Sequence, residues 1–295
     1  MSAALTRSGV VAGALGGRGR AGRTARRWPA ASVAVSLTLL ALAVLAVLLS
    51  PVVSEQALAQ DIMLARLPIG TPEHLLGTDE LGRDVLLLSV AGSASSLVGP
   101  FCIALGSAVL GLLLGSLAGY HRGVTDAVIG RWSDLLLALP VVLVAIVVAG
   151  VFGGGYWWTV ALLIVLFSAS DIRIVRAAVT EQAALPYVES AQVLGLSSRR
   201  IMFGHILPNV LPLAVTNMLL NAAMAIVALS SLSFLGLGVA AGSADWGRQL
   251  ADGRAIMADN PAALFAPALL IIAVACAINV VGDWLLPRLT IGGRR

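Results

Sequence analysis

Apolar residues recur along the chain in long runs that are separated by short polar segments. The runs cover residues 33–49, 93–118, 135–152, 157–170, 210–236 and 263–286. A helix needs about 20 mostly apolar residues to cross the hydrocarbon core of a bilayer. The pattern therefore predicts an all-α, polytopic membrane protein with six transmembrane helices. The run 157–170 is short, but it begins with Trp157 and Trp158, which suit the aromatic belt at a membrane interface.

The first run has an alternative interpretation as part of a cleaved signal peptide. Ala57-Leu58-Ala59 resembles a signal-peptidase site. The apolar segment of a signal peptide is only roughly 7–15 residues long, however, and the run from Val33 to Leu49 exceeds that length. We therefore expect an uncleaved first transmembrane helix.

Composition divides the chain into four parts. Residues 1–31 hold six arginines among Gly, Ala and Ser without apolar periodicity, so we expect a basic cytoplasmic tail without regular structure. Residues 32–92 hold the first transmembrane helix and a polar external loop. Residues 93–288 hold the other five spans, and 289–295 form a second cytoplasmic tail.

The basic residues predict the orientation of the protein in the membrane. All 19 basic residues are Arg, and 15 of them fall on the inner side if residues 1–31 are cytoplasmic. Cytoplasmic segments of membrane proteins are enriched in basic residues. We therefore expect both termini in the cytoplasm and the protein in the cytoplasmic membrane. The arginines lie between apolar runs and form no single patch, which argues against nucleic acid as a partner.

Composition also excludes several kinds of chemistry. The chain has no lysine, so it lacks the loop G-x-x-x-x-G-K-[ST], whose lysine reaches the phosphates of ATP. Cys102 and Cys276 lie in apolar runs, where cysteine usually serves as a small hydrophobic residue. The three histidines lack the spacing of metal ligands. We predict no catalytic residue, no metal site and no cofactor held by this chain.

Three glycines in the second span predict close packing of another helix. Gly111, Gly115 and Gly119 recur every four residues and therefore share one helix face. In membrane helices such a face lets a second backbone approach closely. We expect a structural role for these residues.

Residues 171–208 form the longest predicted cytoplasmic connection, and they carry the signals of two short helices. Pro186 suits the first turn of a helix, and Gly195 suits a left-handed cap at its end. Ser197 or Ser198 can cap a second helix that leads into the fifth span. A compact helical pair attached to a span favours a partner protein as its contact, because a rigid element can transmit a displacement.

This segment resembles the E-A-A-x3-G-x9-I-x-L-P loop of ATP-binding-cassette (ABC) importer permeases. The resemblance lies in Glu189-Ser190-Ala191, in Gly195 and in Ile206-Leu207-Pro208. Ser190 replaces the first alanine, and His205 stands where the general pattern has isoleucine. In that family the loop forms coupling helices that dock into a cleft of the ATP-hydrolysing subunit.

The resemblance implies cytoplasmic coupling helices between spans 4 and 5. The residues expected to contact the ATPase are Glu189, Ser190, Ala191, Gly195, Arg199, His205, Leu207 and Pro208. The pattern leaves open whether Arg199 and its neighbour Arg200 pair with acidic residues of the ATPase or with anionic lipid.

Further segments are similar to the dipeptide, oligopeptide and nickel branch of the same family, and specifically to its C-type permease subunit. They are residues 74–84 (HLLGTDELGRD), 133–140 (SDLLLALP), 231–238 (SLSFLGLG) and 245–247 (DWG). The similarity runs from about Trp28 to Asp283, and the family's permease domain would correspond to residues 93–288.

Membership in this branch implies a set of partners and a class of substrate. The partners would be a second homologous permease chain, two ATP-binding subunits that hold ATP and Mg, an external solute-binding protein, and membrane lipid. Peptides lead as substrates, and nickel chelates or other peptide-sized ligands are alternatives. ATP hydrolysis would belong to the partner subunits, so this chain would not be an enzyme.

The external segment 77–84 is too rich in glycine and charge to lie in lipid. It either caps the helix bundle or forms a gate or contact site for the solute-binding protein. The candidate residues are Gly77, Thr78, Asp79, Gly82, Arg83 and Asp84.

Few ionisable residues are expected deep in the membrane. Asn217 and Asn221 share one face of the fifth span, where they either bond to another helix, the favoured role, or line a solute pathway. Asp171 and Asp283 are expected near span ends. The scarcity of deep charges argues against a secondary transporter or channel with its own proton relay. A membrane anchor for a cytoplasmic enzyme would leave the external charged segment unexplained.

Overall fold

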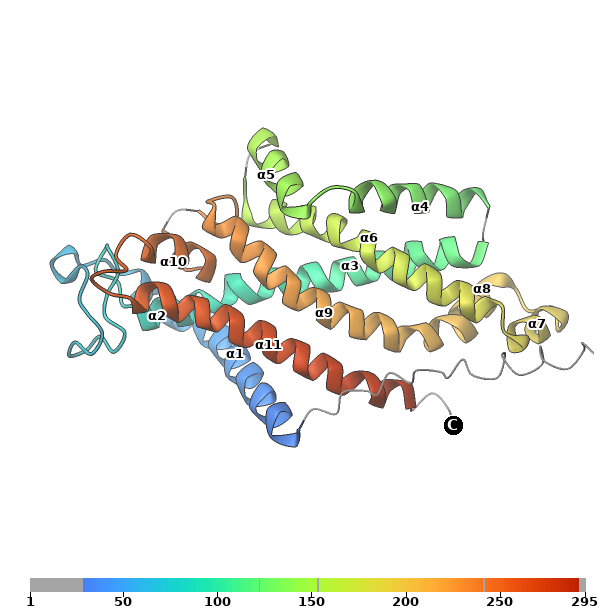
Figure 1. Ribbon diagram of the computed structural model, residues 1–295, viewed down its shortest axis with the longest axis horizontal. Helices are drawn as coiled ribbons and strands as arrows, with labels where there is room; N and C mark the ends of the chain where they lie inside the picture. The colour runs from blue at the N-terminus through green and yellow to red at the C-terminus, as the bar shows by residue number, and fades with distance from the viewer. Residues whose placement is uncertain (1–28, 122, 153, 241, 292–295) are drawn as a thin grey trace, which may run out of the picture.

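The computed structural model describes residues 29–121, 123–152, 154–240 and 242–291, and these ranges fold into an array of helices (Figure 1). The elements are α1 (Ala30–Leu58), the 3-10 turn η1 (Ile62–Leu64), α2 (Val85–Ala91), α3 (Ser93–His121), α4 (Val124–Leu137), α5 (Val141–Phe152), α6 (Tyr156–Ala183), α7 (Pro186–Val193), α8 (Ser198–Ile201), the π-helical segment η2 (Met202–Ile206), α9 (Leu207–Phe234), α10 (Trp246–Gly253) and α11 (Ala262–Ile291). The two predicted tails, 1–31 and 289–295, fall largely on residues 1–28 and 292–295, which lie outside the described residues.

The expected all-α membrane protein is confirmed. Within the described residues, five helical segments are long and apolar enough to cross a membrane. They are α1, α2 with α3, α6, α8 with α9, and α11. A sixth span results if α4 and α5 are counted together.

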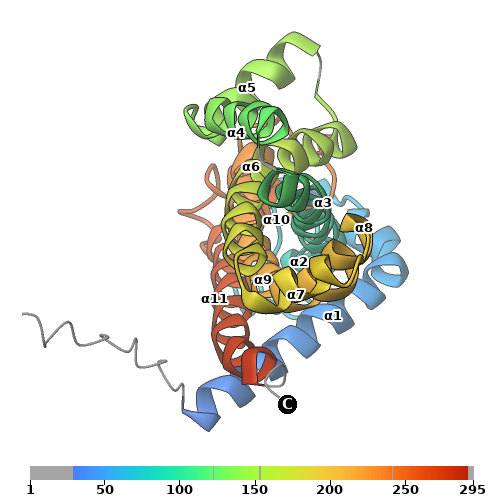
Figure 2. The ribbon, with the colours of Figure 1, turned by 90° about the vertical axis from the view of Figure 1, so that its right-hand side faces the viewer.

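The predicted third span, 135–152, differs from a straight helix. Helix α4 ends at Leu137, α5 begins at Val141, and their axes differ by 87°. Pro140 lies directly before α5, lacks a backbone N–H and restricts the residue before it, which explains the break. Figure 2 shows α4 and α5 on the side of the bundle opposite α1.

The predicted fourth span, 157–170, is longer than expected. Helix α6 continues through 28 residues to Ala183, so the predicted loop at 171–208 begins later than the sequence indicated. The polar residues of the added turns find partners on neighbouring helices. Arg173 donates to Asp134 of α4 at 2.9 Å, and Arg176 donates to Asp126 of α4 at 2.7 Å.

The glycine face of α3 packs against α6, as its spacing predicted. A Cβ atom on Gly115 would lie 2.8 Å from the carbonyl oxygen of Ile172, and one on Gly119 would lie 2.7 Å from that of Arg176. Contacts this short leave no room for a side chain, so the glycines allow α3 and α6 to approach closely. A buried apolar cluster from α3, α6 and α9 continues the contact toward the other end of the bundle.

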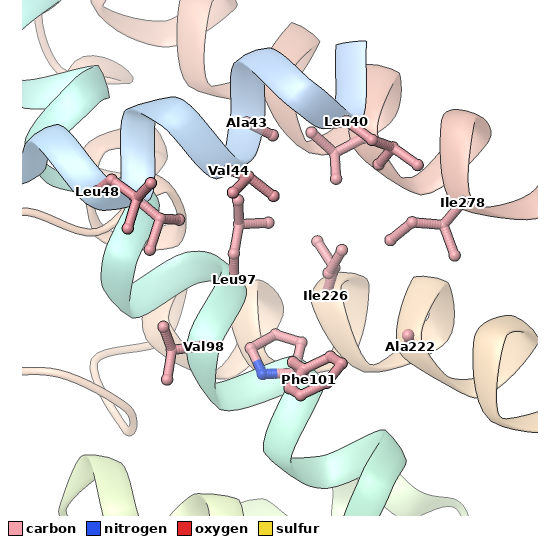
Figure 3. Close-up of a pocket in the computed structure, with 13 residues that line it drawn as sticks. Leu40, Ala43, Val44, Leu48, Leu97, Val98, Phe101, Ala222, Ile226 and Ile278 are labelled. Carbon is pink, nitrogen blue, oxygen red and sulfur yellow. The ribbon is translucent and has the colours of Figure 1, made fainter. Parts of the chain in front are cut away.

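Helix α1 lies against the bundle more loosely. It encloses, with α3, α9 and α11, a cavity of about 370 Å³ whose lining is apolar and includes Val44, Phe101 and Ile278 (Figure 3). Residues 59–84 and α10 lie at one end of the molecule, and α7 and α8 lie at the other (Figure 1). These two ends hold most of the residues that the sequence singled out.

Candidate functional site

Residues 184–206, here called the coupling segment, connect α6 to α9 as a compact helical unit. Pro186 occupies the first turn of α7, where its missing N–H costs no hydrogen bond. Gly195 follows the helix with φ +76°, the left-handed conformation that its position predicted. The N–H of Leu196 then donates to the carbonyl of Ala191 at 3.2 Å, which closes the cap. The coupling segment therefore turns sharply at one glycine.

The second helix of the coupling segment runs into α9 without a loop. The Ser197 hydroxyl accepts the N–H of Arg200 at 3.4 Å and caps α8, as predicted. Residues 202–206 continue as the π-helical segment η2 and join α9 at Leu207. A movement of α8 must therefore move the start of α9.

Buried side chains fix the coupling segment to both helices that flank it. Val188, Ile201 and Ile206 are at most 1% exposed, and they pack in one cluster with Val179 of α6 and Val210 of α9. The cluster has the properties of a small hydrophobic core. It makes the coupling segment a rigid extension of α6 and α9.

Most of the residues predicted to contact an ATPase lie on the outer face of this unit. Exposed residues are Glu189, Ser190, Gly195, Arg199, His205 and Pro208. Ala191 is buried and Leu207 is half-buried, so these two side chains pack inside the protein. Val193 and Leu194, which the sequence analysis did not select, are 84% and 79% exposed beside the turn. The sequence did offer a signal for these two residues: they form an apolar pair next to a turn glycine, and the helix is too short to bury both side chains.

A polar cluster joins α6 to α9 between the two ends of the molecule. Asp171, expected near a span end, lies inside α6 and is only 3% exposed. Its carboxylate accepts the Nδ2–H groups of Asn221, at 3.0 Å from each oxygen, and a hydrogen bond from Asn217. Gly111 of α3 lies against the Asp171 side chain. The two asparagines thus bond to another helix, which was the favoured expectation; that they line a pathway stays a prediction.

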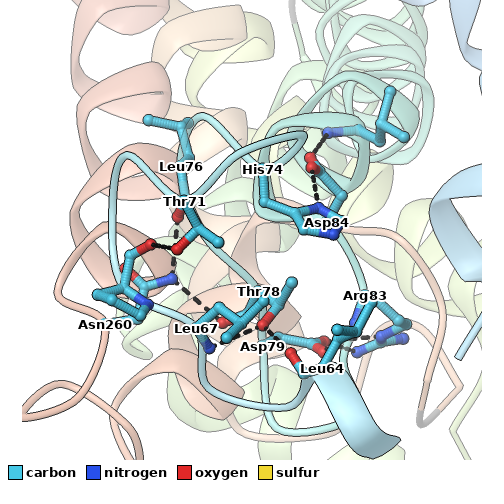
Figure 4. A network of polar contacts seen from close by, with 12 residues as sticks. Leu64, Leu67, Thr71, His74, Leu76, Thr78, Asp79, Arg83, Asp84 and Asn260 are labelled. Atoms are coloured by element: carbon cyan, nitrogen blue, oxygen red, sulfur yellow. Dashed lines mark hydrogen bonds and ion pairs between the residues drawn. The ribbon is translucent and has the colours of Figure 1, made fainter. Parts of the chain in front are cut away.

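At the end of the molecule opposite the coupling segment, Asp79 and Arg83 form a buried ion pair (Figure 4). Arg83 Nε donates to Asp79 Oδ2 at 2.7 Å, and Asp79 Oδ1 accepts the N–H groups of Leu81 and Arg83 at 2.9 Å. Arg83 Nη1 also donates to the carbonyl of Gly242 at 3.0 Å. The two side chains are 10% and 4% exposed. The polar groups of Asp79 and Arg83 therefore bond to other residues of this chain.

Hydrogen bonds within the chain also fix the rest of the external motif (Figure 4). Asn260, two residues before the start of α11, donates to the carbonyls of Leu76 and Thr78 at 2.9 and 3.1 Å. His74 Nδ1 lies 2.8 Å from Asp84 Oδ2, while Asp84 Oδ1 accepts the N–H of Leu87 and caps α2. Gly77 and Gly82 are buried with positive φ. This geometry favours the cap interpretation; contact with another protein stays a prediction and would use exposed neighbours.

Helix α10 fixes the external segment, residues 59–84, to α2 and α3. Asp245 caps α10 by accepting the N–H of Arg248 at 3.1 Å, and it accepts the Ser96 hydroxyl at 3.2 Å. Trp246 Nε1 donates to the carbonyl of Ser89 at 2.7 Å. Gly247 lies against the backbone of Ser230, which no larger residue could do. The segment 245–247 is therefore a packing element.

Comparisons with known proteins agree on one family. The pattern of the family described as binding-protein-dependent transport system inner membrane component matches residues 111–291. The dipeptide transport system permease protein of Haemophilus influenzae is 35% identical over 216 residues, which are 73% of each chain. The glutathione transport system permease protein of Pectobacterium atrosepticum is 34% identical over 212 residues, 72% of this chain and 70% of its own.

A solved structure shows the same fold. The inward-facing methionine ABC transporter MetNI contains a chain that aligns with a TM-score of 0.53 at 17% identity. The alignment covers 70% of this chain and 98% of that one. The chain therefore belongs to the family of binding-protein-dependent transport system inner membrane components, and it is the permease of an ABC importer.

Proposed function

We propose that this permease imports peptides and that a separate ATPase drives it through the coupling segment. The observation that carries the second part is the rigid unit at residues 184–206, which presents an apolar tip at Val193 and Leu194. The substrate class rests on the relatives, which are named as dipeptide and glutathione permeases. ATP hydrolysis in such importers belongs to the ATPase, so this chain is no enzyme.

The complete importer contains four membrane-associated chains and one external protein. This permease pairs with a second homologous chain, two ATP-binding subunits hold ATP and Mg on the cytoplasmic side, and a solute-binding protein delivers substrate outside. The coupling segment and both termini face the cytoplasm. The excess of arginines on that side supports the orientation, and so does the course of α11, which leads from α10 toward the end that carries α7 (Figure 1).

ATP-driven closure of the ATPase pair displaces the coupling segment. Because Val188 and Ile206 are packed against α6 and α9, these two helices move with it. Asp171, Asn217 and Asn221 keep the same two helices together deeper in the bundle. The movement of α6 and α9 then switches the solute pathway between outward and inward access.

A single exposed leucine provides the test. Leu194→Asp places a charge on the apolar tip, where burial of a leucine contributes about 1.5–3 kcal/mol to binding. We expect the ATPase retained with the affinity-purified permease to fall at least about tenfold, while the permease still inserts in the membrane.

Met63→Asp is the matched control, because Met63 is 91% exposed at the opposite end of the molecule. It should leave ATPase retention unchanged. Equal retention in both variants would exclude the tip as the contact. Uptake of a labelled dipeptide by proteoliposomes that hold the complete importer and its binding protein tests the substrate class.

A further inference from the structure

A second pocket lies where the last turns of α3 meet the coupling segment and the start of α9. It holds about 300 Å³, and most of its wall is apolar. Leu113, Leu117 and Phe203 line it and are 50%, 38% and 48% exposed. Large apolar side chains with this exposure require an apolar covering. Unlike the cavity beside α1, this pocket also contains polar groups that can select its occupant.

One of these groups is a buried hydroxyl without a hydrogen-bond partner. Ser116 lines the pocket, is 3% exposed, and its Oγ bonds to no atom of the described residues. Ser89 and Ser107 instead return the hydroxyl to their own helix, to Val85 at 2.8 Å and to Ala104 at 3.1 Å. Ser233 of α9 is also buried without a partner, but it does not line this pocket. A buried polar group without a partner is unfavourable. An acceptor atom on a ligand in the pocket would satisfy Ser116.

The other polar groups are Arg199 and His121, which line the pocket from α8 and from the last turn of α3. Among the described residues, Arg199 has no acidic partner, whereas Arg173 and Arg176 are paired with aspartates of α4. An unpaired guanidinium presents a fork of N–H donors that matches the geometry of a phosphate. The pocket therefore combines an unpaired cation, apolar walls and a buried hydroxyl.

We infer that this pocket binds an anionic phospholipid of the cytoplasmic leaflet. The phosphate lies on Arg199, an acyl chain covers Leu113, Leu117 and Phe203, and the Ser116 hydroxyl donates to an ester carbonyl. A free phosphate would leave the apolar wall uncovered, and the polar backbone of a peptide would be unmatched there. Basic residues at this membrane surface attract anionic lipid.

The lipid would bridge α3 and the coupling segment, so it would bias the position from which the ATPase moves that segment. This consequence rests on the proposed function, which places the coupling segment in the cytoplasm and against the ATPase. Binding of the lipid itself needs no ATPase. The two ideas can therefore fail separately.

The test uses the full-length permease in its assembled importer, reconstituted in phosphatidylcholine nanodiscs with and without phosphatidylglycerol. A photoactivatable phosphatidylglycerol reports binding through labelled peptides of residues 112–121. Arg199→Gln and Ser116→Ala should each lower that labelling at least about fivefold. Arg200→Gln is the matched control, because Arg200 is the neighbouring arginine and does not line the pocket; its labelling should stay unchanged.

Four results would overturn the inference. Labelling that is unchanged in Arg199→Gln and Ser116→Ala would show that lipid does not occupy the pocket. Equal labelling by photoactivatable phosphatidylcholine would remove the requirement for an anion, and suppression by inorganic phosphate alone would identify a phosphate site. Loss of ATPase from Arg199→Gln with unchanged labelling would assign Arg199 to the ATPase contact. Failure of the Leu194→Asp experiment would leave the lipid measurement unaffected.

Discussion

Asp171 connects two helices inside the bundle, although the sequence analysis expected it near the end of a span. Its polarity, at the end of an apolar run, placed it at a membrane surface. The structure satisfies it inside the bundle, because Asn217 and Asn221 lie on the facing side of α9. Spacing alone indicated that the two asparagines share a face. It could not indicate which helix they meet, since that depends on packing.

Removal of this carboxylate should destabilise the bundle. Asp171→Ala leaves the half-buried amides of Asn217 and Asn221 without the carboxylate that accepts their hydrogen bonds. An unsatisfied buried group costs about 1–3 kcal/mol, and we expect the lower part of that range here. Thermal unfolding of the purified permease in mild detergent measures the loss. Asn279→Ala serves as the control, because that amide is exposed and donates to Ala275 of its own helix at 3.0 Å. Equal losses in the two variants would refute the link between α6 and α9.

Gly195 tests the shape of the coupling segment. Apart from its two chain neighbours, no atom of the described residues lies within 4 Å of a Cβ built on Gly195, so its φ of +76° is what opposes substitution. A β-branched residue is strained there by roughly 1–2 kcal/mol, whereas asparagine visits this conformation readily. We expect Gly195→Val to insert and assemble but to lose most transport-linked ATP hydrolysis. Gly195→Asn should keep most of it; normal coupling in Gly195→Val would contradict the account.

At the scale of elements, apolar runs and cap signals predicted most of the helices. Pro186, Gly195 and Ser197 occupy the cap positions that local rules assign, because a cap depends on a few neighbouring residues. The bend between α4 and α5 and the extension of α6 were not predicted. The bend follows from Pro140, a local signal that a hydropathy pattern does not weigh. The extension of α6 depends on contacts between helices, such as Arg176 with Asp126, which satisfy polar residues that a hydropathy pattern assigns to a loop.

The external cap offers a prediction at this scale. Arg83→Gln leaves the buried carboxylate of Asp79 without its cation, which should cost about 3 kcal/mol and loosen residues 59–84 from the bundle. Limited proteolysis of this segment and thermal unfolding measure the effect. Arg66→Gln is the control, since Arg66 is 54% exposed and its ion pairs are 3.6 and 3.7 Å long; we expect a loss of about 0–1 kcal/mol. Similar losses of stability in Arg83→Gln and Arg66→Gln would contradict a structural role for the ion pair of Asp79 and Arg83.

The whole molecule carries its two groups of motif residues at opposite ends of its long axis (Figure 1). One end is closed by a cap in which Asp79, Arg83 and Asp245 are buried within the chain. The other end presents the coupling segment with its apolar tip exposed. The order of the motifs along the chain predicted that these two segments lie at opposite ends. They could not predict which motif residues face outward, because burial is decided by the packed helices.

Site-directed cross-linking is the most direct test of the coupling segment as the point where the ATPase acts. Leu194→Cys is introduced into a full-length permease whose Cys102 and Cys276 are alanine, and the assembled importer is treated with a short thiol cross-linker with and without ATP. The account predicts a cross-link to the ATPase whose yield changes with ATP, and none from Met63→Cys. An active importer that gives no cross-link from residue 194 in either state would contradict it.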